Sequence, residues 1–535
     1  MTCARLLLDL LAAHGIDTAF GIPGVHTLEL YRALNDSPIR HQTPRHEQGA
    51  GFMADGYARA SGRPAACFII TGPGMTNIAT AMGQALADSV PMLVISSVNR
   101  RATLGRGQGR LHEMPNQQAT LSGVSVFSQT ILDPAALPEA VARAFAVFQS
   151  ARPGPVHLEI PLDVLAQPAP KTSIQPARIY PPAPAPAAIR QAAEWLTSAE
   201  QPLVLLGGGC VDAPEAARAL IERLDAPVLT TINAKGVLGR DHPLDLGATA
   251  SLPASRELAA RADVILAVGT ELGETDYDLV FDDGFALTGR LIRVDIDAQQ
   301  LGRNQRADLA ILADAANLLV ALNEQLPGGP VDRQGAARAS QVRNALALHD
   351  QADVAPHLPL LRTLTETLPD AIIVGDSTGP AYAGNYWVSM PRPRHWFSAA
   401  TGFGTLGYAL PAALGAALAR PDALVVALVG DGGLQFTLGE LGSARDLGRP
   451  LAVIVWNNNG YDEIRRSMAA SDVNALGVDL VAPDISALAQ AFSLGYRRCE
   501  RPTQLAEALN QAAEATGPVL IEIPTQPWMH NTGHA

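Results

Sequence analysis

Cysteine, aromatic residues and long uncharged stretches are scarce in this chain of 535 residues. The four cysteines (Cys3, Cys67, Cys210 and Cys499) lie far apart without a CxxC pair, which excludes a disulfide framework and suits a reducing compartment. No stretch of about 18 uncharged apolar residues occurs, so the sequence predicts no transmembrane helix. The N-terminal leucine-rich segment is interrupted by charged and polar residues, which predicts an amphipathic helix rather than a signal peptide. We therefore expect a cytoplasmic protein.

Basic residues are fewer than acidic residues. The chain has 39 Lys and Arg residues against 52 Asp and Glu, and no basic run offsets its net charge of −13. This balance excludes the electrostatic footprint of a nucleic-acid-binding protein. With 47% hydrophobic and 17% charged residues, the composition indicates a well-buried globular chain. The expected partner is a small molecule, not a nucleic acid or a membrane.

Composition divides the chain into three parts. Residues 166–188 are rich in Pro and Ala, which predicts an extended linker. A second, softer boundary lies at residues 326–330, where Pro and Gly cluster. These two breaks predict domains at residues 1–165, 189–330 and 355–535.

Each part alternates short apolar runs with helical patterns. This alternation predicts three doubly wound α/β domains, each with a parallel sheet covered by helices. Glycines 207–209 follow one predicted strand and allow two interpretations, a dinucleotide-binding loop or a tight turn from strand to helix. The full GxGxxG pattern is missing, which favours the turn. The apolar runs are residues 66–71, 91–96, 202–206, 264–268, 292–296 and 372–374.

The most informative pattern is a Gly-Asp-Gly tripeptide around Asp431, with Asn458 placed 27 residues later. Each of the two ends an apolar run, and a helical stretch lies between the runs, so together they predict one β-α-β unit with both strand ends at the same sheet edge. Carboxylate and amide oxygens are ligands that Mg²⁺ prefers beside phosphate oxygens, and glycine lets backbone N–H groups approach a diphosphate. The strands are expected at 424–429 and 451–456, and the helix at 440–447.

A second group of motifs lies in the first part of the chain. It comprises GIPG at 21–24, HEQGAGFMADGYARASG at 46–62 and TGPGMTN at 71–77. Together with the Gly-Asp-Gly pattern, these segments resemble thiamine diphosphate enzymes of the acetolactate synthase and pyruvate oxidase branch. The resemblance spans the whole chain, since NAKGVLGRDHPLDLG at 233–247 and GFGTLGYALPAALGA at 402–416 are also similar to that branch.

This resemblance implies a fold of pyrimidine-binding, central and pyrophosphate-binding domains. It implies an active site between the first domain of one subunit and the third domain of another, hence at least a homodimer, with a homotetramer usual in the branch. The implied cofactors are thiamine diphosphate and Mg²⁺. The branch often carries FAD as well, and the sequence does not decide whether FAD is bound here.

The resemblance also assigns roles to individual residues. Glu47 is expected to bond the aminopyrimidine, the Gly404 carbonyl to accept from its amino group, and Leu406 to lie under the folded cofactor. Gln117 matches a family glutamine near the cofactor and is a candidate catalytic residue. Mg²⁺ is assigned to Asp431, Asn458 and Gly460, and the diphosphate to Gly432, Gly433, Ser377 and Thr378.

The substrate is indicated by segments that depart from the synthases. GIPGVHTLELYR at 21–32 and LHEMPNQ at 111–117 resemble 5-guanidino-2-oxopentanoate decarboxylases. A substrate ending in a guanidinium group calls for a carboxylate in the pocket. The candidates are Glu113, Asp462 and Glu463, with Tyr461 beside them; the alternative is that these acids are solvated loop residues. His26 and His112 are candidate proton relays, with a packing role as the alternative.

The sequence therefore predicts a thiamine diphosphate- and Mg²⁺-dependent decarboxylase that converts a 2-oxo acid to an aldehyde and CO₂, with 5-guanidino-2-oxopentanoate as the favoured substrate. The alternative is a carboligase of the acetolactate synthase type that condenses pyruvate with a second 2-oxo acid. A catalytically silent subunit is disfavoured, because Glu47, Asp431 and Asn458 are all present.

Overall fold

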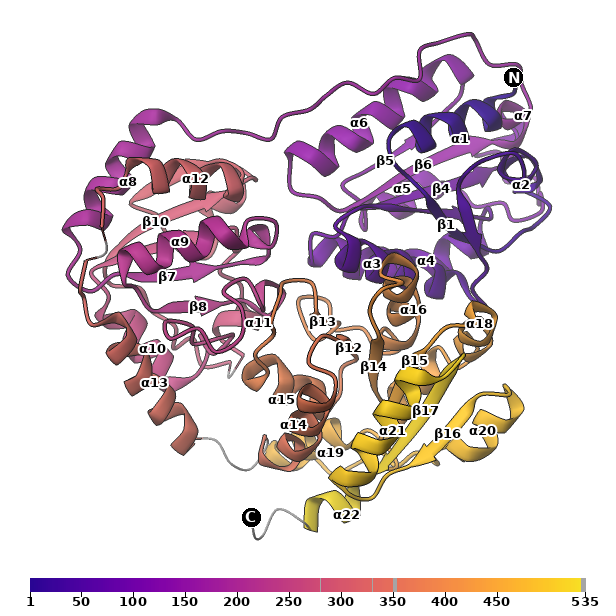
Figure 1. Cartoon of the computed structure of the whole chain (residues 1–535). Helices are drawn as coiled ribbons and strands as arrows, with labels where there is room; N and C mark the ends of the chain where they lie inside the picture. The colour runs from indigo at the N-terminus through magenta and orange to yellow at the C-terminus, as the bar shows by residue number, and fades with distance from the viewer. Residues whose placement is uncertain (280, 330, 350–353, 531–535) are drawn as a thin grey trace.

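The computed structural model describes residues 1–279, 281–329, 331–349 and 354–530. Within these ranges the chain forms three lobes, each built around one sheet (Figure 1). The sheets have six, five and six strands, and all the strand pairs within them are parallel. The predicted fold class, three parallel-sheet α/β domains, is confirmed. Residue 330, the predicted end of the central domain, and the final residues 531–535 lie outside the described ranges.

The first domain has the strand order β2-β1-β3-β4-β6-β5. Its strands β3, β4 and β6 are buried along their whole length, as expected of apolar runs covered on both faces. The strands are β1 (Thr18–Gly21), β2 (Arg40–Gln42), β3 (Ala65–Ile69), β4 (Met92–Val98), β5 (Phe127–Thr130) and β6 (Pro155–Pro161). The helices are α1 (Cys3–Ala13), α2 (Leu28–Leu34), α3 (Glu47–Ser61), α4 (Pro73–Ala87), α5 (Gln117–Ser122), α6 (Leu137–Ser150) and α7 (Leu162–Leu165).

The central domain has the order β11-β10-β9-β7-β8. Helix α13 follows the predicted boundary at residue 330 and packs on this domain, where Arg338 donates to the carbonyl of Pro202 and Arg343 to that of Pro243. The strands are β7 (Leu203–Leu206), β8 (Val228–Thr230), β9 (Val264–Val268), β10 (Arg290–Asp295) and β11 (Leu309–Leu312). The helices are α8 (Pro186–Ser198), α9 (Pro214–Leu224), α10 (Pro253–Arg261), α11 (Glu274–Tyr277), α12 (Ala315–Gln325) and α13 (Gly335–His349).

The third domain has the order β13-β12-β14-β15-β17-β16, the same topology as the first. The predicted β-α-β unit is present, but a short extra helix, α17, begins at Asp431 itself. The strands are β12 (Ile372–Gly375), β13 (Trp396–Ser398), β14 (Val425–Gly430), β15 (Leu451–Asn457), β16 (Gly495–Arg498) and β17 (Pro518–Pro524). The helices are α14 (Leu358–Thr367), α15 (Gly379–Trp387), α16 (Ala409–Ala419), α17 (Asp431–Phe436), α18 (Glu440–Leu447), α19 (Asp462–Ala470), α20 (Ile485–Ala491), α21 (Pro502–Glu514) and α22 (Thr525–His530).

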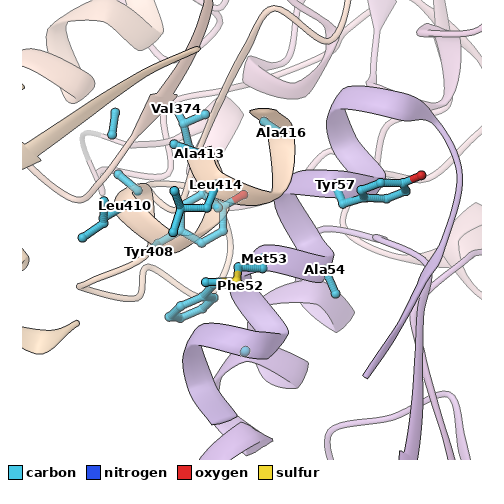
Figure 2. Packing of buried hydrophobic residues seen from close by; sticks show 14 of the residues in the cluster. Phe52, Met53, Ala54, Tyr57, Val374, Tyr408, Leu410, Ala413, Leu414 and Ala416 are labelled. Atoms are coloured by element: carbon cyan, nitrogen blue, oxygen red, sulfur yellow. The ribbon is translucent and has the colours of Figure 1, made fainter. Parts of the chain in front are cut away.

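Helices α3 and α16 join the first domain to the third. Figure 2 shows Phe52 and Met53 of α3 facing Tyr408, Leu410 and Leu414 at and within α16. The helices approach closely because glycine faces backbone on both sides. A Cβ on Gly56 would lie 1.9 Å from the Ala412 carbonyl oxygen, and one on Gly415 would lie 1.8 Å from that of Met53.

The predicted linker runs between α7 and α8 as an extended strap across the molecule (Figure 1). Residues 171–178 of this linker are exposed throughout, so they contribute little to the packing between the domains. No helix within the described ranges is both long and apolar enough to cross a membrane.

Candidate active site

Glu47 is the first residue of α3, and its side chain is half-buried against the start of α4. Asn77 donates a hydrogen bond to its Oε2 at 2.9 Å. The other carboxylate oxygen faces Gly74, where an added Cβ would lie only 3.3 Å away. Glu47 is therefore held in one orientation at the edge where the loops following β1, β3 and β4 meet.

His26 and His112 lie beside each other in these loops, with ring centroids 5.1 Å apart. Burial and the neighbouring His112 lower the pKa of His26, so its neutral form is favoured. The His112 carbonyl packs closely against Gly72, since a Cβ added there would lie 2.4 Å from the carbonyl oxygen. Glu47, His26 and His112 thus belong to one loop cluster in the first domain.

Glu113 extends this cluster. The backbone N–H of Arg110 donates to its Oε2 at 2.9 Å and holds the pKa of the Glu113 carboxyl below its usual range. Its Oε1 is buried and has no hydrogen-bond partner among the described residues. A buried carboxylate oxygen without a partner is costly, so this atom is a candidate for binding a ligand donor.

Gln117 is the first residue of α5. Its side chain is buried, and its Oε1 accepts the N–H of Gly72 at 2.8 Å. Its Nε2 donates to Ser96, to the Ser97 carbonyl and to Glu159. Because both ends of the amide are used within the protein, the geometry favours a role in positioning the loop after β3. A catalytic role for Gln117 stays an untested prediction.

In the third domain, Asp431 directly follows β14 and is 1% exposed. Its carboxylate accepts the backbone N–H of Asn458 at 3.2 Å and that of Gly460 at 3.0 Å. Burial raises the pKa of Asp431, while these N–H groups oppose the shift. The structure thus brings together the three residues that the sequence assigns to a cation.

The oxygens of this group fit a hard cation. The Asn458 side-chain oxygen lies 2.8 Å from the Gly460 carbonyl and 2.9 Å from Oδ1 of Asp431. Neighbouring ligands of an octahedral Mg²⁺ with 2.0–2.1 Å bonds are about 2.9 Å apart, so both separations from the Asn458 oxygen match those of such ligands. Rotated by 180°, the amide would instead donate to both oxygens. No trio of His, Cys, Asp and Glu side chains forms a metal cluster in the described ranges, so amide and carbonyl oxygens are essential to this donor set.

The predicted diphosphate ligands surround the same turn. Gly432 and Gly433 occupy the first turn of α17, where backbone N–H groups lack partners within the helix. Thr378 is buried beside Gly430, where a Cβ would lie 3.2 Å from its Oγ1, and Ser377 precedes it. The Tyr461 ring lies against Gly432, at 2.6 Å from an added Cβ.

Gly404 and Leu406 lie in the loop before α16. This loop is fixed from two sides: Asp376 accepts the Gly407 N–H at 3.2 Å, and Gln84 accepts from Thr405. Asp376 is fully buried, and burial raises its pKa to about 6. The predicted cofactor loop is therefore positioned by two polar side chains that the sequence interpretation missed.

Asp462 and Glu463 are already paired with arginines of their own helix. Asp462 contacts Arg465 at 3.1 Å and Arg466 at 3.4 Å. Glu463 pairs with Arg466 and also lies close to Gly379. Both acids do bind guanidinium groups, but the chain itself supplies them.

Helix α4 contacts both Glu47 and the loop of Gly404, at positions two turns apart. Asn77, which orients Glu47, and Gln84, which holds the Gly404 loop, are seven residues apart and so about 10 Å apart along the helix. Among the described residues, no hydrogen bond or salt bridge joins Glu47 or Glu113 to Asp431 or Asn458. We call the group around Glu47 and the group around Asp431 the two half-sites.

One further carboxylate orients Glu47 from the third domain. Glu440 is 1% exposed and accepts the backbone N–H groups of Arg45 and His46 at 3.0 and 3.1 Å, just before Glu47. Ser443 donates to its other oxygen. No local pattern reveals this contact, because the partners are 395 residues apart.

Three family models match this chain. The thiamine pyrophosphate enzyme N-terminal TPP-binding domain matches residues 1–120, the central domain residues 189–322 and the C-terminal TPP-binding domain residues 374–523. A probable 2-ketoarginine decarboxylase of Pseudomonas aeruginosa is 45% identical over 98% of this chain and 94% of its own. The chain belongs to the thiamine pyrophosphate enzyme family.

Two acetolactate synthases are similar to the chain at lower identity. The large subunit of acetolactate synthase isozyme 1 from Escherichia coli is 30% identical over 98% of this chain and 93% of its own. The Mycobacterium tuberculosis acetolactate synthase large subunit is 31% identical over 98% and 88%. The two TPP-binding domain matches contain the two half-sites, so thiamine diphosphate (thiamine pyrophosphate) is the cofactor of this family member.

Glycines 207–209 bring the ends of two central-domain strands together. The Gly207 N–H is donated to the Val268 carbonyl at 2.9 Å, and the Gly209 N–H to that of Gly269 at 3.2 Å. These glycines allow the ends of β7 and β9 to touch, since a Cβ on Gly207 would lie 2.0 Å from the Gly269 oxygen. Two of the three N–H groups are thus unavailable to a diphosphate, and the glycine run is a tight turn.

Proposed function

We propose that this thiamine diphosphate enzyme decarboxylates 2-ketoarginine (5-guanidino-2-oxopentanoate) to the guanidino aldehyde and CO₂, with Mg²⁺ as the second cofactor. The observation that carries the proposal is the difference in similarity: 45% identity to the probable 2-ketoarginine decarboxylase against 30–31% to the acetolactate synthases, over almost the same length. The departures in the first-domain loops, noted from the sequence, occur in the cluster that contains Glu113.

The bound cofactor supplies the nucleophilic carbon and the electron sink for loss of CO₂. The role of Glu47 is to hold a proton at the pyrimidine ring, with its orientation set by Asn77 and by the Glu440 contact to the preceding backbone. Asp376 and Gln84 hold the loop of Gly404 and Leu406, which are assigned to the pyrimidine amino group and the folded cofactor.

The diphosphate and the cation belong at the tip of β14. Asp431, Asn458 and Gly460 would hold Mg²⁺ through the three converging oxygens described above. The N–H groups of Gly432 and Gly433 and the hydroxyls of Ser377 and Thr378 are assigned to the diphosphate. The Asp431 carboxylate stays ionised beside the cation because the opposite charge favours that form.

Glu113 is the preferred partner for the substrate guanidinium. Its Oε1 is buried and forms no hydrogen bond with any described residue, and nearby backbone N–H groups favour its ionised form. Asp462 and Glu463 are less suited, since each already contacts Arg466. His26 and His112 are assigned to proton transfer beside Glu47, and Tyr461 to the pocket wall above Gly432.

The complete site requires a second copy of the chain. Within one chain no hydrogen bond or salt bridge between described residues joins Glu47 or Glu113 to Asp431 or Asn458, and apolar side chains of both domains are exposed. A homodimer that buries these side chains would bring Glu47 of one protomer to Asp431 of its partner, and a homotetramer would pair two such dimers. The exposed side chains are Val25, Leu28 and Leu111 in the first domain and Phe403, Phe436 and Ile464 in the third.

Mixing two inactive variants tests the shared site. Each Glu47→Gln protomer keeps an intact third domain, and each Asp431→Asn protomer keeps an intact first domain. After exchange of subunits, one site of every mixed dimer contains both native residues, so about a quarter of the native activity should return. If the site lies within one chain, the mixture stays inactive.

The reaction itself is tested by CO₂ release with thiamine diphosphate and Mg²⁺. The 2-oxo acids are 2-ketoarginine, pyruvate, 2-oxobutyrate and the uncharged 2-oxohexanoate, with the organic product identified in each case. Preferred turnover of 2-ketoarginine to the aldehyde supports the proposal. Acetohydroxy acid formation from pyruvate would instead identify a carboligase.

Substrate recognition has its own test. Glu113→Gln should raise KM for 2-ketoarginine by about 10- to 100-fold, the cost of losing one charge-assisted hydrogen bond, and leave KM for 2-oxohexanoate nearly unchanged. Asp462→Asn is the matched comparison on the third domain. A larger effect of Asp462→Asn than of Glu113→Gln would move the recognition site to α19.

A further inference from the structure

Asp376 directly follows β12, which lies between β13 and β14 in the third domain. Its side chain is fully buried. Within the part of the chain that the structure describes, it forms no salt bridge, and the hydrogen-bond donors to its carboxylate are backbone N–H groups. Because a buried carboxylate is costly without hydrogen-bond donors, its donors show which segments of the chain it holds.

These donors belong to two loops that are far apart in the sequence. The Ser377 N–H, in the loop after β12, donates to Oδ1 of Asp376 at 2.9 Å, and the Gly407 N–H, in the loop before α16, donates to the same oxygen at 3.2 Å. Oδ2 accepts the N–H of Ala409, the first residue of α16, at 3.1 Å. The carboxylate therefore joins the loop after β12 to the loop before α16.

The start of α17 packs against the same carboxylate. A Cβ added to Gly433 would lie 3.2 Å from Oδ1 of Asp376. The residue after α17 also contacts the loop before α16, since the Thr437 hydroxyl donates to the Gly407 carbonyl at 2.8 Å. Three segments that are assigned to the cofactor thus meet around one buried side chain.

In the proposed function, these segments hold opposite ends of one molecule. The loop after β12 and the start of α17 are assigned to the diphosphate, and the loop before α16 is assigned to the rings. Because covalent bonds fix the length of the cofactor, the rings are placed correctly only when these segments keep a fixed separation. A displacement of about 1 Å can lower the rate of a reaction about 100-fold. A side chain that bonds both loops is suited to set that separation.

We infer that Asp376 is a positioning residue that couples the two ends of the cofactor site, so that a diphosphate bound at the loop after β12 also orders the loop before α16. A diphosphate that fixes Ser377 fixes the carboxylate that this residue bonds, and through it the N–H groups of Gly407 and Ala409. This inference deepens the proposed function and rests on its placement of the diphosphate at Ser377 and Thr378.

Inorganic diphosphate tests the coupling, because it has the charged end of the cofactor and lacks the rings. Hydrogen exchange of the full native chain is followed by mass spectrometry with Mg²⁺ alone and with Mg²⁺ and diphosphate. We expect slower exchange at residues 377–378 and 431–436, where the diphosphate is assigned, and about fivefold slower exchange or more at Gly407 and Ala409. Residues 214–224, which form α9 in the central domain, should exchange equally in both conditions.

Asp376→Asn tests whether the coupling passes through the carboxylate. The asparagine keeps one acceptor oxygen, but its NH₂ group cannot accept, so one set of N–H groups loses its partner. We expect diphosphate to slow exchange at residues 377–378 as before, without an effect at Gly407 and Ala409. The melting temperature checks that the variant folds.

The same variant carrying thiamine diphosphate separates positioning from stability. At saturating cofactor, exchange of the thiazolium C2 proton with solvent should be about 10- to 100-fold slower than in the native protein, because the rings are misplaced. The Kd of thiamine diphosphate should rise only about 10-fold, the cost of one lost hydrogen bond. A role in stability alone would leave the exchange of the saturated protein unchanged.

Asp263→Asn is the matched control. Asp263 in the central domain also accepts three backbone N–H groups, from Glu200, Gln201 and Val264 at 2.7–2.9 Å. It bonds none of the segments assigned to the cofactor, so its variant should couple diphosphate to Gly407 and Ala409 as the native chain does. An equal loss of coupling in both variants would contradict the role of Asp376.

The possible failures can be told apart. If diphosphate slows exchange neither at residues 377–378 nor at 431–436, its placement in the proposed function is wrong, and the coupling is wrong with it. If exchange slows there but not at Gly407 and Ala409 of the native chain, the coupling alone is wrong. Equal slowing at these two residues in the native chain and in Asp376→Asn would show that another contact carries the coupling. Should Asp376→Asn fail to fold, the native measurement alone decides between coupling and no coupling. No 2-oxo acid is used, so an error in the proposed substrate leaves the result intact.

Discussion

The first and third domains share one topology but carry different chemistry at the same positions. In both sheets the strand order is second, first, third, fourth, sixth, fifth, and the helix after the second strand, α3 or α16, forms the contact between them. After the third strand, the first domain has the glycine-rich start of α4 and the third has Asp431. The fold decides where the loops lie, and the loop sequences decide what they do.

The loops after the fourth strands show the same division. Following β4, the first domain presents His112 and Glu113, which suit proton transfer and recognition of a cation. Following β15, the third presents Asn458 and Gly460, whose oxygens converge with Asp431. In the proposed function, the first domain would therefore supply acid–base groups and the third would supply metal ligands.

Removing the acid of the first domain should have the largest effect. Glu47→Gln keeps the shape and loses the carboxyl, so turnover should fall about 10²–10⁴-fold, the usual contribution of a positioned acid or base. Thiamine diphosphate affinity and melting temperature should change little. Turnover is measured as CO₂ release, with the exposed Glu200→Gln as control. Native turnover in Glu47→Gln would remove this residue from the mechanism.

The equivalent change in the third domain should act on binding. Asp431→Asn removes the charge that pairs with the cation, so the affinity for thiamine diphosphate with Mg²⁺ should fall about 100-fold. Activity titrated with cofactor at fixed Mg²⁺ separates this from a loss of turnover. Asp370→Asn, on the exposed surface, serves as control. A fall in turnover at unchanged affinity would contradict the division between the domains.

The contact between the two domains can be broken without touching either half-site. Gly415→Ala would place a Cβ 1.8 Å from the Met53 carbonyl, so α3 and α16 must separate. We expect a loss of about 1–3 kcal/mol in the free energy of unfolding, measured by urea denaturation. Gly123→Ala is the control, because nothing lies within 4 Å of a Cβ there. Equal stability of the two variants would show that the interface adapts.

Acid should weaken both domains through buried histidines. Burial lowers the pKa of His157 in the first domain to about 3 and that of His357 in the third to about 4, from 6.5 in the unfolded chain. Below about pH 6.5 the unfolded chain binds more protons, so stability is full above that pH and falls by about 1.4 kcal/mol per pH unit for each residue as the pH drops.

Melting temperatures at pH 7 and pH 5 measure this effect. His157→Gln should reduce the difference between the two temperatures, and His357→Gln should reduce it by a similar amount. The Ser96 and Ser128 hydroxyls that now bond His157 can bond the glutamine amide, which limits the cost of the change. An unchanged difference in both variants would mean that other groups control the acid sensitivity.

Much of the fold was accessible from the sequence because apolar runs and helical periodicity are local. The same holds for Asp431 and Asn458, since polar residues that end parallel strands must share a sheet edge. Contacts between distant segments were not accessible: Glu440 bonds the backbone before Glu47, and Asp376 bonds Gly407. Gln117 shows the converse, because only the structure reveals that its amide is fully used by Gly72 and Glu159. The exact domain boundaries and the roles of the site residues stay predictions.

The pairing of α3 with α16 also has a consequence for how the chain is made. The glycine-bearing face of α3 leaves the ribosome about 350 residues before α16, a delay of roughly 20–70 s at 5–20 residues per second. During that time Phe52 lacks its ring contact with Tyr408, although the rest of the first domain can fold. The newly made first domain therefore exposes an apolar surface that favours aggregation. Until synthesis passes residue 419, the fraction that folds correctly in the cell should depend on chaperones.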